Sequence, residues 1–236
     1  GVACAGWIAE RVPAEAVVDL RNDGTARVAC GSQDIGTGTY TMVSQIGGER
    51  LGIDPRRVQP VLGDTDLPLG PISGGSMATG SLVPAIFHAA YNATKALLQM
   101  ASSSKDTPFS GKPVEQLAYT EGRVHLKGEA SSKGMPFEEL LQKINMQAVT
   151  GSGKSEGTQA DKKVSRHSYG VQFVEVTWEP AIARLRVPRA VTVIDAGRIV
   201  NPKTARNQIM GAVVMGVGMG LFEETLYDQK NGALVN

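Results

Sequence analysis

Three glycine- and hydroxyl-rich loops, each directly before a predicted helix, carry the residues whose types and spacing could do chemistry. They are residues 36–38, 73–76 and 201–204. A helix N-terminus presents four unpaired N–H groups and a partial positive charge, so it attracts anions, and glycine lets a large ligand approach the backbone. One such loop is typical of ordinary helix capping. Three of them, with Lys203 in the last, indicate a ligand with several phosphates or carbonyl oxygens.

Side chains that could attack a substrate or bind a metal are scarce. The three histidines, His88, His125 and His167, fit no metal-ligand spacing. Asp64 and Asp66 could form a carboxylate pair, but at i and i+2 in a turn they favour loop capping. We therefore predict no catalytic residue and no metal ligand in this sequence, which is suited to holding a ligand.

Two glycine motifs imitate nucleotide-binding sequences. Residues 148–155 resemble a P-loop whose first glycine is replaced by alanine. A P-loop follows a strand and opens a helix, whereas here a predicted helix precedes the motif and a charged segment follows it. Residues 216–220 resemble half of a dinucleotide fingerprint, but they lie at the end of a predicted helix, where close packing through small residues is the simpler interpretation.

The elements that must position the loops are hairpins and strands with helices packed against them. This pattern predicts an α+β fold with mixed sheets. Residues 150–166 are polar, charged and rich in Gly and Ser, and we expect them to be the most mobile stretch. The predicted helices are 39–51, 81–100, 136–144 and 202–222, and the predicted strands are 16–20, 25–30, 58–62, 117–119, 123–126, 171–178, 183–187 and 190–194.

Composition excludes several classes of protein. The chain has 236 residues, with 24 Lys and Arg against 23 Asp and Glu, so it lacks the basic surplus of a nucleic-acid binder. No apolar run reaches the roughly 20 residues of a membrane span. Two cysteines cannot build a disulfide framework. The 28 glycines exceed the usual share of about 7%, which directs attention back to the loops.

Together, the loops resemble those of the molybdenum-cofactor-binding subunit of the xanthine dehydrogenase and aldehyde oxidase family. Residues 31–41 resemble the first cofactor loop of that family, 63–79 the second, and 196–212 the third, which is a long and specific match. The likeness is greater to bacterial aldehyde oxidoreductases that use molybdopterin cytosine dinucleotide than to the animal enzymes. It covers residues 1–101 and 168–236 of one partial domain, while 102–167 carry only a hairpin, a short helix and a flexible insert.

The resemblance implies a molybdenum centre that hydroxylates aldehydes or N-heterocycles with oxygen from water. Electrons would pass to 2Fe–2S clusters and FAD on partner subunits or domains, and the rest of the molybdenum subunit would be a further partner. The resemblance also implies cofactor contacts in all three loops. These contacts are Ile35, Gly36, Thr37, Ala78, Thr79, Arg198, Ile199, Val200, Asn201, Pro202, Lys203, Thr204 and Gln208.

One part of the family pattern is missing. Its general base is a Glu in a Gly-Val-Gly-Glu-like motif beyond the third loop, and Glu223 and Glu224 do not match it. Since the sequence also lacks an initiator Met, we interpret it as an excised domain, inactive alone and binding cofactor weakly or not at all. Members of the family occur in the cytoplasm and the periplasm. Two alternatives remain open: a non-catalytic module that binds nucleotides or phosphorylated metabolites, and a scaffold domain whose loops only cap helices.

Overall fold

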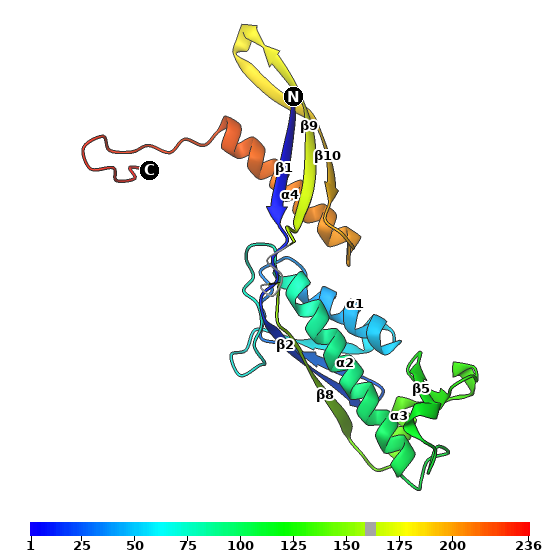
Figure 1. Cartoon of the computed structure of the whole chain (residues 1–236). Helices are drawn as coiled ribbons and strands as arrows, with labels where there is room; N and C mark the ends of the chain where they lie inside the picture. Colours follow the sequence, from blue (N-terminus) through cyan, green and yellow to red (C-terminus); the bar gives the residue numbers. More distant parts are fainter. Residues whose placement is uncertain (159–163) are drawn as a thin grey trace. The chain divides into compact units, whose positions relative to one another are not determined.

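The computed structural model describes residues 1–158 and 164–236. It divides into two compact units (Figure 1). Unit 1 consists of Gly1–Ile8 and His167–Asn236, and unit 2 consists of Ala9–Arg166. Each unit combines an antiparallel or mixed sheet with helices, so the predicted α+β fold is confirmed. The first and second loops fall in unit 2 and the third falls in unit 1.

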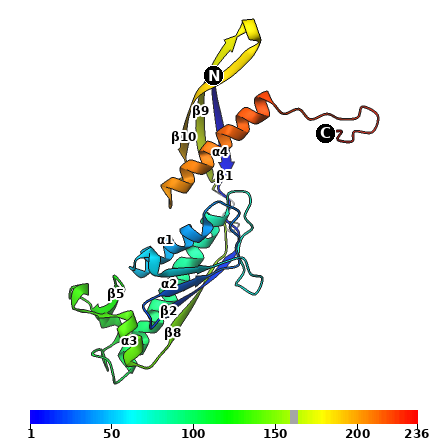
Figure 2. The ribbon, with the colours of Figure 1, turned by 180° about the vertical axis from the view of Figure 1, so that it is seen from behind.

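Unit 2 is built on a four-stranded sheet with two helices on one face (Figures 1 and 2). Helix α2 lies on β2 and β8, and α1 lies on β3 and β4. Strand β2 alternates buried and half-buried residues, which places one of its faces in the core and leaves charged side chains on the other. In the order β4-β3-β2-β8 only β3 and β4 run parallel. The bounds are β2 Ala14–Arg21, β3 Ala26–Ala29, α1 Thr39–Leu51, β4 Val58–Val61, α2 Ala78–Ser103 and β8 Ala148–Ser155.

Unit 2 also contains a second, smaller sheet followed by a short helix. Strands β5 (Leu117–Thr120), β6 (Arg123–Leu126) and β7 (Met135–Pro136) form an antiparallel sheet, and helix α3 (Phe137–Lys143) follows it. The side chains of Phe137, Leu140 and Leu141 in α3 are fully buried. The predicted hairpin and short helix of this region are therefore confirmed.

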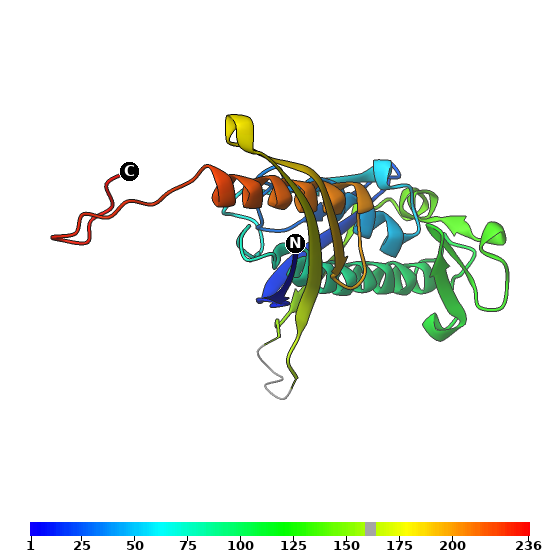
Figure 3. The same cartoon turned by 90° about the horizontal axis from the view of Figure 1, so that it is seen from above.

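Unit 1 is a three-stranded antiparallel sheet with one long helix crossing a face of it (Figure 3). Its strands are β1 (Val2–Ile8), β9 (His167–Glu179) and β10 (Arg184–Asp195), in the order β1-β9-β10, and its helix is α4 (Pro202–Leu221). No residue of α4 is buried among the described residues. No helix in the described parts of the chain is both long and apolar enough to cross a bilayer.

Several predicted elements were wrong in extent or type. Strand β1 had no predicted counterpart, and α2 begins at Ala78, three residues before the predicted start of this helix. Residues 148–155, inside or beside the stretch expected to be mobile, form strand β8, while 159–163 lie outside the described residues. The strand forms because Gly151 and Gly153 let its backbone lie directly on α2, where a Cβ at Gly153 would lie 2.8 Å from the carbonyl carbon of His88.

Candidate functional site

The first and second predicted cofactor loops are held together in unit 2. The Gly31 N–H donates to the Pro68 carbonyl at 2.6 Å, and residue 31 forms a parallel bridge with Leu69. Two further bonds join Gln33 to Ser73: the Ser73 N–H donates to Gln33 Oε1 at 3.1 Å, and the Ser73 hydroxyl donates to the Gln33 carbonyl at 2.7 Å. Two segments 40 residues apart thus form one surface.

Some of the loop glycines are required by the contact between the first and second loops. A Cβ at Gly70 would lie 2.5 Å from the carbonyl carbon of Gly31, and a Cβ at Gly31 would overlap the Pro68 carbonyl oxygen. Glycine is therefore required at both positions by the approach of two strands of backbone. Gly36 differs, because it has a φ of 98° and nothing within 4 Å of a Cβ position. Its left-handed backbone requires glycine, and the space beside it is open.

The carboxylate of Asp34, a residue of the first loop, is bound at the start of α1. Its Oδ1 accepts from the N–H groups of Gly36 at 2.8 Å and Gly38 at 3.2 Å, and its Oδ2 accepts from Tyr40 at 3.2 Å. Desolvation raises the pKa of Asp34, but these backbone N–H groups outweigh it and hold the pKa below its ordinary value. Sequence reasoning missed this residue, although the Asp-Ile-Gly-Thr-Gly spacing was a signal for it.

The start of α2 is open by comparison. Its N-cap residue, Met77, makes no side-chain cap, and the next residues are Ala78 and Thr79, both predicted cofactor contacts. The stem of Arg11 packs beside this turn, since a Cβ at Gly80 would lie 3.3 Å from Arg11 Cγ. This first turn therefore combines N–H groups without a side-chain cap, the exposed side chain of Thr79 and a nearby cationic residue.

The start of α4 lies in unit 1 and is capped by Asn201. The Asn201 Oδ1 accepts from the N–H groups of Lys203 at 3.1 Å and Thr204 at 3.2 Å. Upstream, Asp195 Oδ1 accepts from the Gly197 N–H at 3.0 Å. The predicted third-loop contacts therefore lie in the turn between β10 and α4 (198–201) and in the first turns of α4 (202–204 and Gln208). Lys203 and Gln208 are exposed, and Gln208 lies one helical turn beyond Thr204.

Asp64, His88 and His125, which could in principle act in catalysis or metal binding, make hydrogen bonds within the chain. Asp64 Oδ1 accepts from the Asp66 N–H at 2.9 Å, so the expected loop capping is confirmed. His88 Nδ1 lies 2.6 Å from the Lys154 carbonyl, and His125 is buried with Nδ1 3.0 Å from the Leu126 carbonyl. Across residues 1–158 and 164–236, no three His, Cys, Asp or Glu side chains gather in a way that could hold a metal ion.

The two glycine motifs have different outcomes. Residues 148–155 form a strand that no helix follows directly, so rejecting them as a P-loop was right. Gly216, Gly218 and Gly220 lie in α4, where a Cβ at Gly216 or Gly220 would meet no described atom within 4 Å and one at Gly218 would meet the side-chain Oε1 of Glu223 at 2.9 Å, with no neighbouring element beside any of the three. Within the described residues, therefore, the close packing expected at these glycines is not present.

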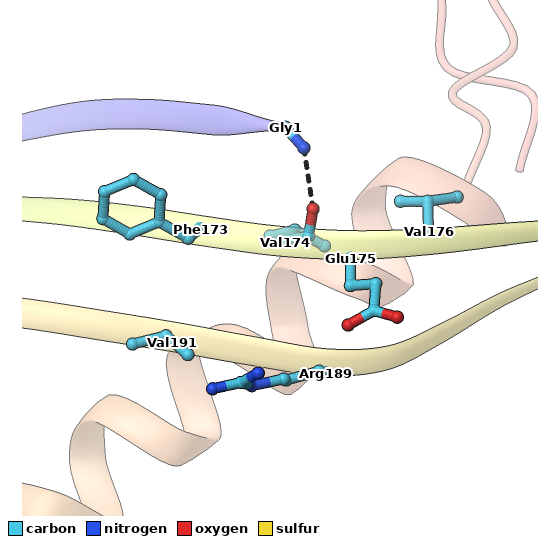
Figure 4. A pocket seen from close by; sticks show the side chains of 7 residues that line it. All are labelled: Gly1, Phe173, Val174, Glu175, Val176, Arg189 and Val191. Carbon is cyan, nitrogen blue, oxygen red and sulfur yellow. Dashed lines mark hydrogen bonds between the residues drawn. The ribbon is translucent and has the colours of Figure 1, made fainter.

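An open hollow in unit 1 is lined by none of the predicted contacts. It is lined by β9 and β10 and by the start of the chain, where the Gly1 amine donates to the Val174 carbonyl at 2.7 Å (Figure 4). Glu175 and Arg189 lie opposite each other in the sheet at this point, beside the register shift between Arg186 and Arg189. Among the described residues, no Ser, Thr, Cys, His or Lys side chain lines the hollow.

Comparison with known proteins places these observations in a family. Residues 1–236 match the family model described as molybdopterin cofactor-binding domain. The chain is 32% identical over 219 residues to the aldehyde oxidoreductase molybdenum-binding subunit PaoC of Escherichia coli K12, covering 93% of this chain and 28% of that protein. It is 30% identical over 216 residues to the 6-hydroxypseudooxynicotine dehydrogenase complex subunit gamma of Paenarthrobacter nicotinovorans, covering 90% of this chain and 26% of that protein.

Solved structures agree in fold. A Cu,Mo-CO dehydrogenase superposes with a TM-score of 0.81 at 18% identity, covering all of this chain and 31% of that one. A quinoline 2-oxidoreductase from Pseudomonas putida 86 gives 0.78 at 22% identity, over all of this chain and 31% of that one. The chain thus spans less than a third of the length of these relatives. It belongs to the molybdopterin cofactor-binding domain family.

Proposed function

We propose that residues 1–236 form part of the cofactor-binding region of a molybdenum hydroxylase that takes aldehydes or N-heterocycles as substrates. The observation that carries this proposal is the clamp between Gln33 and Ser73, which joins two loops of the family pattern into one surface. A scaffold domain would need only to cap each helix separately. The family match over the whole chain supports the same conclusion.

In unit 2, the cofactor contacts are Ile35, Gly36, Thr37, Ala78 and Thr79. The residues present fit a large polar group, because the space beside Gly36 is open and the first turn of α2 has no side-chain cap. Backbone N–H groups and the Thr37 and Thr79 hydroxyls provide donors for carbonyl and phosphate oxygens.

In unit 1, the contacts are residues 198–204 and Gln208. Asn201 orders this turn by accepting from the backbone of Lys203 and Thr204, so it positions the segment. The exposed Lys203 ammonium suits a phosphate of the dinucleotide. The exposed Gln208 amide, one turn beyond Thr204 in α4, suits a further acceptor. The nucleotide is molybdopterin cytosine dinucleotide.

When bound, the cofactor supplies the oxidation of substrate with oxygen from water, and the residues of this chain bind and orient it. The partners are the remainder of the molybdenum subunit and the parts of the complex that carry 2Fe–2S clusters and FAD. We expect residues 1–236 alone to have no turnover, because they lack the family's catalytic Glu motif. We also expect them to hold cofactor weakly or not at all.

The test measures molybdenum and released nucleotide on the intact complex purified from its host. We expect about one molybdenum and one cytidine monophosphate per copy of this chain after acid hydrolysis. A Lys203→Ala variant should retain less of both, while Lys105→Ala, a change in the 102–167 region, should retain as much as the native protein. A complex without molybdenum that is stabilised by simple nucleotides in a thermal-shift panel would favour the nucleotide-binding module instead.

A further inference from the structure

The first loop has an unusual division of its N–H groups. Those of Gly36, Gly38 and Tyr40 all donate to the carboxylate of Asp34. Those of Ile35 and Thr37 donate to no group in the described residues. The Thr39 N–H also lies against this carboxylate. Asp34 thus occupies the N–H groups at the start of α1, whereas those of Ile35 and Thr37 remain available to a ligand. The Ile35 side chain is 68% exposed, so this part of the loop is accessible in unit 2.

The carboxylate also takes the place of a helix cap. The N-cap of α1 is Gly38, which has a φ of 85° and no side chain to accept a bond. Asp34, four residues earlier, accepts from the N-cap residue itself and from Tyr40 in the first turn. Because the partial positive charge at this terminus already faces a full negative charge, a phosphate placed there would be repelled and would find three donors in use.

The three helix starts are therefore not equivalent. Asp34 closes α1 with a charge, Asn201 closes α4 with a neutral amide, and Met77 leaves α2 without a side-chain cap. Of these three starts, α1 is the one where a carboxylate of the chain accepts from the helix N–H groups.

We propose that Asp34 is the positioning residue of the first loop. Its carboxylate fixes residues 34–40 and neutralises the start of α1, so that this loop receives an uncharged acceptor, such as a ring carbonyl, through the N–H groups of Ile35 and Thr37. The phosphates of the dinucleotide are then held elsewhere. This inference rests on the proposed function for the identity of the ligand, but the role of Asp34 within the loop does not.

The first experiment uses the intact protein without cofactor. Asp34→Ala should lower the melting temperature by about 2–4 °C, as expected for loss of a helix cap in a protein of this size. Formate should restore much of this loss, because a small carboxylate can occupy the space left by the side chain. Chloride at equal ionic strength should not. Equal responses of the native protein and the variant to formate would overturn the positioning role.

The charge is tested with Asp34→Asn, which keeps one acceptor and removes the negative charge. Inorganic phosphate should raise the melting temperature of this variant more than that of the native protein, because the start of α1 now attracts an anion. Asp64→Asn is the matched control, since Asp64 also caps a loop N–H but lies outside a helix start. A phosphate response that is the same in all three proteins would overturn the claim that Asp34 excludes anions.

Hydrogen exchange separates this inference from the proposed function. In the cofactor-free protein, the amides of Gly36, Gly38 and Tyr40 should be protected, and those of Ile35 and Thr37 should exchange rapidly. In the intact holoenzyme, Ile35 and Thr37 should gain at least tenfold protection. Unprotected amides at 36, 38 and 40 would overturn the role of Asp34. Absence of a gain at 35 and 37 in a molybdenum-loaded enzyme would overturn the recognition step, whereas an enzyme without molybdenum would overturn the proposed function.

Discussion

The Ser73 hydroxyl donates to the Gln33 carbonyl at 2.7 Å while the Ser73 N–H donates to the Gln33 side chain, so one residue of the second loop binds both the backbone and the side chain of one residue of the first. Both residues lie before helices that pack on the same sheet. The two hydrogen bonds therefore connect the loop before α2 to the loop before α1.

Replacing Ser73 by Ala should loosen the second loop more than it destabilises the protein. The lost hydroxyl bond is exposed, so the free energy of unfolding should fall by only about 0.5–1 kcal/mol. Hydrogen exchange of residues 71–76 should nevertheless accelerate. Ser103→Ala is the control, because that hydroxyl donates at 3.4 Å to a carbonyl in the same helix and joins no loops. Unchanged exchange at 71–76 would show that the clamp does not order the loop.

Replacing Gly153 by Ala should destabilise unit 2 by at least about 1–3 kcal/mol, because the added methyl group would overlap the backbone of α2 at Ala85 and Ala89. Urea unfolding measures the loss. Gly211→Ala is the matched change in α4, where a Cβ meets nothing within 4 Å, and it should stabilise the helix by about 0.5–1 kcal/mol. A tolerated Gly153→Ala would contradict the direct packing of β8 on α2.

Two neighbouring arginines should differ in their contribution to stability. Arg57 donates to the Gly24 carbonyl at 2.6 Å and to Glu138 at 2.9 Å, which joins the first hairpin to α3. We expect Arg57→Ala to cost about 1–3 kcal/mol of unfolding free energy, since it leaves a half-buried carboxylate without its partner. The Arg56 side chain is 89% exposed and pairs with Asp54, so solvent screens the pair and Arg56→Ala should have a much smaller effect than Arg57→Ala. Equal losses would disprove the distinction.

The stability supplied by Asp34 should depend on pH in one direction. Because its pKa is lower in the folded chain than the ordinary 3.8, the ionised form stabilises the folded state above that value, and the contribution disappears as the pH falls through the folded pKa. The difference in unfolding free energy between the native protein and Asp34→Asn should therefore be constant from about pH 7 to pH 5 and shrink below about pH 4. A difference that grows on acidification would reverse the assignment.

The two cysteines should react very differently with alkylating reagents. Burial raises the pKa of the Cys30 thiol to about 12, so it stays protonated at pH 8, whereas Cys4 is exposed on β1. Iodoacetamide at pH 8 should modify Cys4 alone in the folded chain, and both residues in urea. Rapid labelling of Cys30 without denaturant, detected by mass spectrometry of its peptide, would show that the end of β3 opens.

Much of the local structure follows from residues close together in the chain. The Asp-Gly turn predicted the hairpin of β2 and β3, and the apolar spacing at Met42, Val43 and Ile46 predicted α1 with its end at Gly52. The third loop was expected before a helix, and Asn201 does cap α4. These features depend on turn chemistry and on side-chain periodicity, both of which act over a few residues.

Only the tertiary structure decided which glycines lie beside open space and which lie against the chain. Gly31 and Gly70 are required by the approach of two loop backbones, Gly151 and Gly153 by the approach of a strand to α2, and Gly36 by its own left-handed backbone. Sequence alone could not separate these cases, because all three use the same residue. What distinguishes them is the group that would meet an added Cβ, and that group, where there is one, is distant in the sequence. For the same reason, β8 was mistaken for a mobile segment: its stability comes from contact with α2 residues about 60 positions earlier in the chain.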